Sequence, residues 1–168
     1  PPRRSSGLAA PETGVTPREP AGAEAVKASA KRIAPRLKVL APEAEQSRRL
    51  TREGIDLVRD HGLFKTLQPE RSGGHQLTLR THLDVVSALS EGCVSTGWVV
   101  GVAHAHSWLI GHMSRQAQDD VYANNPNAFV AAVVGPRGKA VKRADGSFQL
   151  NGFWPFGSGS DYADWLML

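Results

Sequence analysis

Residues 151–165 read NGFWPFGSGSDYADW, a stretch in which aromatic side chains alternate with glycine, proline and serine. The opening pair, Asn151 and Gly152, is typical of a tight turn between two strands. Residues 154–159 have too many turn-forming residues for a regular element, whereas residues 164–168 are largely apolar again. This order predicts a turn, a loop rich in aromatic side chains, and then the beginning of a further strand.

The sequence before this stretch predicts a small β-region. Residues 124–127 have the composition of a turn, and an Asp-Gly pair at Asp145 and Gly146 separates two short β-type runs, which is a hairpin signal. The strands that we expect are 129–134, 140–143 and 148–150. Residues 124–168 therefore predict the first part of an antiparallel β-domain. Because the last apolar run reaches the end of the sequence, we expect a longer protein to continue from it.

Residues 21–123 predict a helical domain. Apolar residues recur at intervals of three and four along the first helix, namely Val26, Ala30, Ile33, Leu37 and Leu40. Pro35 predicts a kink or break in this helix, and Pro42 suits the first turn of a second helical stretch.

Polar residues mark the expected ends of the later helices. We expect N-caps at Thr51, Thr81, Ser95–Thr96 and Ser114, with Gly62 ending the helix that starts at Thr51. Between them, residues 63–69 predict a short extended link. In the last helix, Ala117 and Val121 are expected to face inward. With the β-region, this pattern predicts an α+β fold.

Composition excludes several classes of protein. The 168 residues carry a formal net charge of +4, but basic and acidic residues are interleaved, which indicates solvated helix faces rather than a nucleic-acid interface. The single cysteine, Cys93, excludes an internal disulfide, and the histidine spacing does not fit a metal site. No apolar run is long enough for a membrane helix. We expect a cytoplasmic protein whose Pro-rich residues 1–20 form a disordered tail.

Three segments resemble acyl-CoA dehydrogenases, and in particular the reduced-flavin monooxygenases that share their fold. The first comprises residues 62–74, which are similar to the link between the early helices of the family. The second is Ser-Thr-Gly-Trp at residues 95–98. The third is residues 151–165, where Phe156-Gly157-Ser158 stands in place of the Trp-Ile-Thr that is usual in the dehydrogenases. The resemblance covers residues 25–168 and favours the oxygenase branch, which includes 4-hydroxyphenylacetate hydroxylases.

The resemblance implies a flavin site and roles for particular residues. Ser158 matches the serine near flavin N5, where a hydroxyl can both donate and accept a hydrogen bond. Trp98 is expected against the flavin, and His106 beside the substrate, where it could hold a phenol proton. The further cofactor-binding residues that we expect are Val134, Gly135, Phe156 and Gly157. From the residues alone, Ser158 could equally be a turn serine, and His106 a hydrogen-bonded core histidine.

The implied function is hydroxylation of a small phenolic substrate through a C4a-hydroperoxyflavin. It requires FMNH₂ or FADH₂ from a separate flavin reductase, and O₂. Enzymes of this type also have a C-terminal helical bundle, which completes the flavin site and a homotetramer. We therefore expect this chain, truncated before that bundle, to be inactive alone. Two alternatives stay open: an acyl-CoA dehydrogenase-type flavoprotein, and a non-catalytic helical interaction module.

Overall fold

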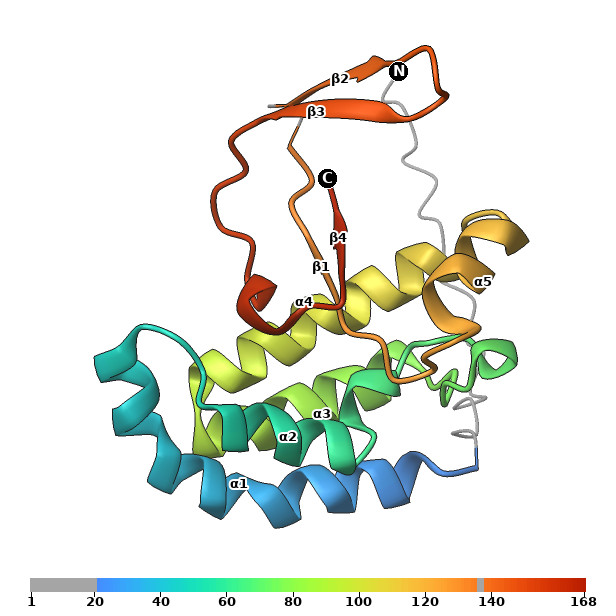
Figure 1. The fold of residues 1–168 in the computed structure, drawn as a ribbon. Helices are drawn as coiled ribbons and strands as arrows, with labels where there is room; N and C mark the ends of the chain where they lie inside the picture. The colour runs from blue at the N-terminus through green and yellow to red at the C-terminus, as the bar shows by residue number, and fades with distance from the viewer. Residues whose placement is uncertain (1–20, 136–137) are drawn as a thin grey trace, which may run out of the picture.

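A helical domain is followed by short strands in the computed structural model, which describes residues 21–135 and 138–168 (Figure 1). The helices are α1 (Ala23–Ser47), α2 (Arg52–Asp60), α3 (Leu79–Gly92), α4 (Val94–Gly111) and α5 (Arg115–Tyr122). The strands are β1 (Val130–Ala132), β2 (Gly138–Lys142), β3 (Phe148–Gly152) and β4 (Trp165–Met167). This order confirms the expected fold class. The tail expected at residues 1–20 lies outside the described residues.

Helix α1 is continuous, so the break expected at Pro35 and the separate helix expected from Pro42 are wrong. Each proline removes one intrahelical hydrogen bond, because it has no backbone N–H. The two prolines are seven residues apart and both are exposed, as are Lys31 and Lys38, whose carbonyls lose their partners. Water can bind those carbonyls, so the helix persists and curves along its length (Figure 1).

Two of the expected helix starts are confirmed by their capping bonds. The side chain of Thr51 accepts a hydrogen bond from the Gly54 N–H at 3.0 Å. The side chain of Ser114 accepts one from the Ala117 N–H at 3.3 Å. Gly62 follows α2 with a φ of 67°, the left-handed conformation expected of it.

The start expected at Thr81 is wrong, because Thr78 caps α3 and accepts from the Thr81 N–H at 3.2 Å. Thr81 is instead fully buried inside the first turn. Helix α4 begins at Val94, one residue before the expected pair, and its N-cap Cys93 makes no side-chain capping bond. The link expected to be extended contains a 3₁₀ turn, η1 (Leu63–Lys65), whose apolar residues are buried in the core.

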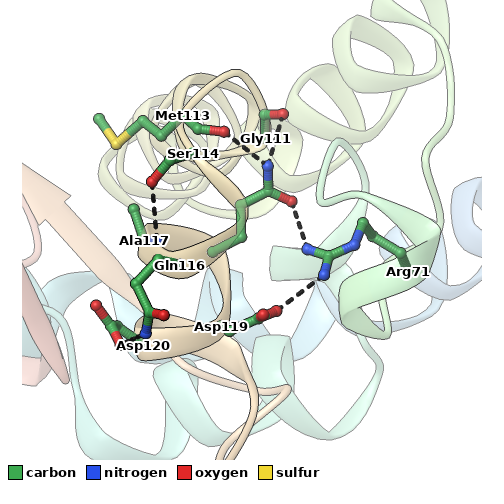
Figure 2. Close-up of polar contacts among 9 residues, drawn as sticks. Arg71, Gly111, Met113, Ser114, Gln116, Ala117, Asp119 and Asp120 are labelled. Atoms are coloured by element: carbon green, nitrogen blue, oxygen red, sulfur yellow. Dashed lines mark hydrogen bonds and ion pairs between the residues drawn. The ribbon is translucent and has the colours of Figure 1, made fainter.

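Helix α5 is joined to the rest of the domain by a polar network (Figure 2). The Gln118 amide donates to the carbonyls of Gly111 and Met113 at the end of α4 and accepts from Arg71 at 2.8 Å. Arg71, in the 3₁₀ turn η2 (Glu70–Ser72), also binds Asp119 at 2.9 Å. The network supplies hydrogen-bond donors to the carbonyls of Gly111 and Met113, which have no partner within α4 because the helix ends there.

This network also explains why the inward face of α5 differs from the expected one. Gln118 and Tyr122 are buried, whereas Ala117 and Val121 are only partly so. Helical periodicity pointed to the small apolar residues, but a buried glutamine with its hydrogen bonds satisfied takes the inward position.

The strands form two separate pairs. Strands β2 and β3 make the expected antiparallel hairpin, and β1 pairs with β4 in parallel. The turn expected at Asn151 and Gly152 is wrong, because these residues end β3 and pair with Lys139 and Gly138. The ring of Trp154 packs over the two paired glycines, where a Cβ on Gly138 would collide with it.

The main core contains α1, α2, α3 and the inward side of α4, together with Phe129, which stacks on Phe64 at a ring-centroid distance of 4.7 Å. A second apolar cluster, with Ile110, Tyr122 and Val130, joins the end of α4 to α5 and β1. Within the described residues, no helix combines the length and apolarity that a membrane crossing requires.

Residues 156–164 are fastened to the helical domain at several points. The Asp164 carboxylate accepts a hydrogen bond from the Phe129 N–H at 2.8 Å. The Tyr162 hydroxyl donates to the Leu50 carbonyl at 2.6 Å. Gly159, with a φ of 83°, lies so close to the Phe129 ring that a Cβ would come within 2.4 Å of it. These contacts place the aromatic loop against α4.

We expect Gly159→Ala to destabilise the chain more than Gly146→Ala. Both glycines have a similar positive φ, 83° and 87°, so both variants strain the backbone by about 1–2 kcal/mol. Only at Gly159 does the new Cβ also collide with the Phe129 ring, since nothing lies within 4 Å of a Cβ at Gly146. Urea unfolding should show an additional loss of about 1–3 kcal/mol for Gly159→Ala. Equal losses would mean that the loop does not pack on Phe129 in solution.

Candidate functional site

A cavity of about 670 Å³ lies between the N-terminal half of α4, the α1–α2 turn and the loop of residues 156–162. Four of the expected site residues line it: Trp98, Phe156, Gly157 and Ser158. Its other walls include Leu50, Val94, Val99 and Tyr162. The loop therefore brings its serine and one aromatic side chain to the helix that carries Trp98, although these segments are far apart in sequence.

Trp98 and Ser158 are in direct contact. The indole Nε1–H of Trp98 donates a hydrogen bond to the Ser158 hydroxyl oxygen at 3.0 Å. The backbone fixes Ser158 locally, because its N–H donates to the Phe156 carbonyl at 2.8 Å and closes a tight turn around Gly157. The Ser158 hydroxyl is thus held both through its backbone and through its oxygen.

Phe156 has an unusual conformation for a bulky residue. Its φ is 64°, in the left-handed region that L side chains rarely adopt, and its side chain is 94 % exposed. Such strain is typically maintained only where surrounding structure enforces it, as at ligand-binding sites. Here it presents a phenyl ring at the mouth of the cavity, opposite the indole-bearing helix.

His106 lies elsewhere on α4 and does not line this cavity. It is buried, and its Nδ1 lies 2.9 Å from the Val130 carbonyl of β1. A carbonyl only accepts, so Nδ1 carries the hydrogen and Nε2 of the neutral ring keeps a lone pair. Nε2 has no hydrogen-bond partner among the described residues, and the side chain is buried.

Val134 and Gly135 are likewise outside the cavity. Both follow β1, and Val134 is 85 % exposed, while nothing lies within 4 Å of a Cβ at Gly135. The structure therefore brings together four of the expected site residues. It leaves apart from them His106, which lies on α4 and bonds to β1, and Val134 and Gly135, which follow β1.

Sequence reasoning missed Tyr162 and Arg52. Tyr162 closes the cavity on the side of the α1–α2 turn, through its bond to Leu50, and the Arg52 guanidinium lies 4.8 Å from the centre of its ring. A tyrosine shortly after a glycine-rich loop was the only available signal. Its partners come from a turn far away in sequence, so no local pattern could predict them.

A histidine pair joins α4 to α3, with His104 fully buried and His82 partly buried. The Nδ1 atoms of His82 and His104 are 2.8 Å apart, and Nε2 of His104 contacts the Leu63 carbonyl. His104 must therefore donate from Nε2 and accept at Nδ1 from His82. Burial lowers the pKa of His104 to about 3, and it also lowers the pKa of His82. Both rings are neutral near pH 7 and lock α3, α4 and η1 together.

No group of three or more potential metal ligands occurs among residues 21–135 and 138–168. A second cavity, of about 890 Å³, lies near the other end of α4 beside Trp108 and Arg71, and none of the expected site residues lines it. The first cavity offers groups that suit a flavin, namely the aromatic rings of Trp98 and Phe156 and the hydroxyl of Ser158. The rest of its wall combines apolar residues with the charged residues Glu45, Arg48, Arg49 and Asp161.

The geometry defines a helical domain joined to the start of a β-domain, with an aromatic cavity between them. Comparison with known proteins gives the family. Residues 21–125 match the family model described as acyl-CoA dehydrogenase, N-terminal domain. The chain therefore belongs to the acyl-CoA dehydrogenase family.

Individual relatives are oxygenases. The chain is 34 % identical to the oxygenase subunit of a flavin-dependent monooxygenase from Rhodococcus jostii, over 81 % of this chain and 35 % of the relative. It is 32 % identical to the oxygenase component of p-hydroxyphenylacetate 3-hydroxylase from Acinetobacter baumannii, over 81 % and 32 %. The structure of XiaF from Streptomyces sp., in complex with FADH2 and glycerol, superposes with a TM-score of 0.80 at 29 % identity, over 86 % and 36 %. The chain thus spans about a third of the length of these proteins.

We expect the stability of the chain to fall as the pH drops below about 6.5, with His104 as a principal cause. The pKa of His104 is lowered in the folded state, so protons bind preferentially to the unfolded chain between the ordinary pKa of 6.5 and about 3. The contribution of His104 to the free energy of unfolding is fully present above pH 6.5, and it is lost as the pH falls from 6.5 toward about 3. From pH 7 to pH 5 His104 alone should remove about 2 kcal/mol.

Urea unfolding at several pH values measures this effect. His104→Gln, which keeps a donor for the Leu63 carbonyl, should flatten the pH dependence, whereas the exposed control His112→Gln should preserve it. The same pH dependence in His104→Gln and in the unmodified chain would show that His104 is not the group responsible.

Proposed function

We propose that this chain is part of the oxygenase component of a two-component flavin-dependent monooxygenase that hydroxylates a small aromatic substrate. The observation that carries the proposal is the Ser158 hydroxyl, held by Trp98 at the wall of a cavity with aromatic sides. The relatives that share most of this chain are oxygenase components. Reduced flavin, FMNH₂ or FADH₂, would supply the electrons that activate O₂.

The residues of the chain have separate tasks in this proposal. Trp98 and Phe156 would hold the flavin ring through their aromatic side chains, and the Gly157 turn would let the backbone approach it closely. Ser158 offers its hydroxyl to flavin N5. The apolar residues of the cavity would limit the access of water to a bound flavin, although charged residues line part of the wall. Val134 and Gly135 belong to the cofactor surface in this proposal, through backbone groups at the end of β1.

His106 acts on the substrate in the proposed mechanism. Its Nδ1–H is fixed by the Val130 carbonyl, which orients the ring and leaves the Nε2 lone pair for a phenol proton. Removing that proton raises the electron density of the aromatic ring and makes it a better nucleophile toward activated oxygen. The sequence places His106 about two helical turns beyond Trp98, so one helix positions both cofactor and substrate.

The partners in this proposal are a separate flavin reductase, O₂ and a small phenol. Since the matched relatives are about three times as long, we propose that catalysis requires the region that follows this segment in them. We also propose a cytoplasmic homotetramer for the complete protein.

Oxygen consumption by the complete protein tests the proposed class. With reduced FMN or FAD from a reductase, and resorcinol or p-hydroxyphenylacetate as probe, we expect O₂ uptake with formation of hydroxylated product. Bleaching of bound oxidised flavin by an acyl thioester, without such uptake, would instead identify a dehydrogenase. Absence of saturable binding of reduced flavin would favour an interaction module.

His106→Asn should separate substrate activation from flavin oxidation. Asparagine can still donate to the Val130 carbonyl, but it offers no basic nitrogen at the position of Nε2. We expect product formation to fall by about 100-fold, the usual contribution of a general base, while flavin oxidation continues and releases hydrogen peroxide. His112→Asn, at the exposed end of α4, is the control. Product formation at the unmodified rate in His106→Asn would exclude His106 as the base.

A further inference from the structure

We infer that Trp98 is a positioning residue that sets the direction of the Ser158 hydroxyl, in addition to any contact of its ring with the flavin. This inference rests on the proposed function, because its consequence concerns a flavin beside Ser158. The observation behind it is the single hydrogen bond from Trp98 Nε1–H to Ser158 Oγ, at 3.0 Å, between residues on α4 and on the aromatic loop.

The direction of this bond follows from the chemistry of the two groups. An indole N–H can only donate, so it occupies one of the two lone pairs of the serine oxygen. The hydroxyl hydrogen of Ser158 is therefore not used by Trp98. No acceptor for that hydrogen is found among residues 21–135 and 138–168, and Ser158 lines the cavity. One donor and one acceptor position thus remain for a ligand there.

Those two remaining positions match both redox states of a flavin. In reduced flavin N5 carries a hydrogen, which the free lone pair of Ser158 can accept. In oxidised flavin N5 has a lone pair, to which the Ser158 hydrogen can be donated. Because Trp98 holds the oxygen itself, the hydroxyl can change partner roles by rotation about its C–O bond without leaving its place.

Apart from the hydrogen bond from Trp98, the surroundings of Ser158 do little to fix its side chain. Its neighbours Gly157 and Gly159 have no side chains, and its own side chain is only partly buried, so packing alone does not select one χ1 rotamer. Trp98 is itself 63 % exposed, so its N–H could bind water instead. The bond to Ser158 therefore serves orientation rather than the solvation of a buried indole.

The hydrogen bond can be tested without any turnover. In the cofactor-free complete protein labelled with ¹⁵N-tryptophan, the Trp98 indole resonance is identified by its loss in Trp98→Phe. Ser158→Ala should shift this resonance upfield in the proton dimension, because the acceptor is lost. Ser160→Ala, which removes an exposed hydroxyl from the same loop, should leave it in place. An unmoved resonance in Ser158→Ala would overturn the inference.

The functional consequence is tested by the fraction of consumed O₂ that appears as hydroxylated product. Trp98→Phe keeps an aromatic ring but has no N–H, so we expect roughly a fivefold rise in hydrogen peroxide per product, the size expected for one lost hydrogen bond. Ser158→Ala should act at least as strongly, and the double variant no more than Ser158→Ala alone.

The outcomes separate the two proposals. If the unmodified protein hydroxylates its substrate and Trp98→Phe remains as well coupled, a positioning role for Trp98 is refuted while the proposed function stands. If the unmodified protein does not hydroxylate any phenol, the proposed function fails, and the indole resonance alone then decides whether Trp98 orients Ser158.

Discussion

The whole arrangement depends on α4, a helix that is apolar on almost every side. Most of its sides are covered, while Val94, Trp98 and Trp108 stay exposed. Helix α3 packs on one side of it, η1 and β1 on others, and α5 is tied to its end. Because α4 also carries Trp98 and His106, the elements that cover it are the same ones that fix the candidate site. Figure 1 shows α4 between α1, α2 and α3 on one side and the β1–β4 pair on the other.

Local chemistry predicted much of the helical domain. Three helix ends were predicted correctly, those at Thr51, Ser114 and Gly62. Each depends on a hydrogen bond or a backbone angle within a few residues, so the local sequence was enough to indicate it. At the start of α3 the sequence indicated Thr81, which was wrong: Thr78 is the cap and Thr81 is buried in the first turn. The prediction from the two prolines of α1 was wrong for a related reason. The free energy that each proline costs the helix depends on whether the carbonyl that loses its hydrogen bond is exposed to water.

Long-range contacts explain what the sequence could not predict. The Asn151–Gly152 pair has the composition of a turn, yet its pairing with Gly138 and the Trp154 ring make it the end of a strand. The parallel pairing of β1 with β4 likewise joins distant segments. In the candidate site, the resemblance indicated Trp98, Phe156, Gly157 and Ser158, but only the fold shows that an indole N–H meets the serine oxygen. For Tyr162 the only local signal was its position shortly after the glycine-rich loop.

The expected site residues lie in two places in the structure. Trp98, Phe156 and Ser158 line one cavity, while His106 is held from the other direction by the first residue of β1, Val130. A flavin and a phenol must approach each other from opposite sides, because the reacting oxygen has to lie between them. A strand that anchors the histidine, and whose continuation contacts the loop through Val133 and Gly157, can set that separation. Large exposed aromatic rings such as Phe153 and Phe156 then mark the surfaces at which further protein is expected to close the site against water.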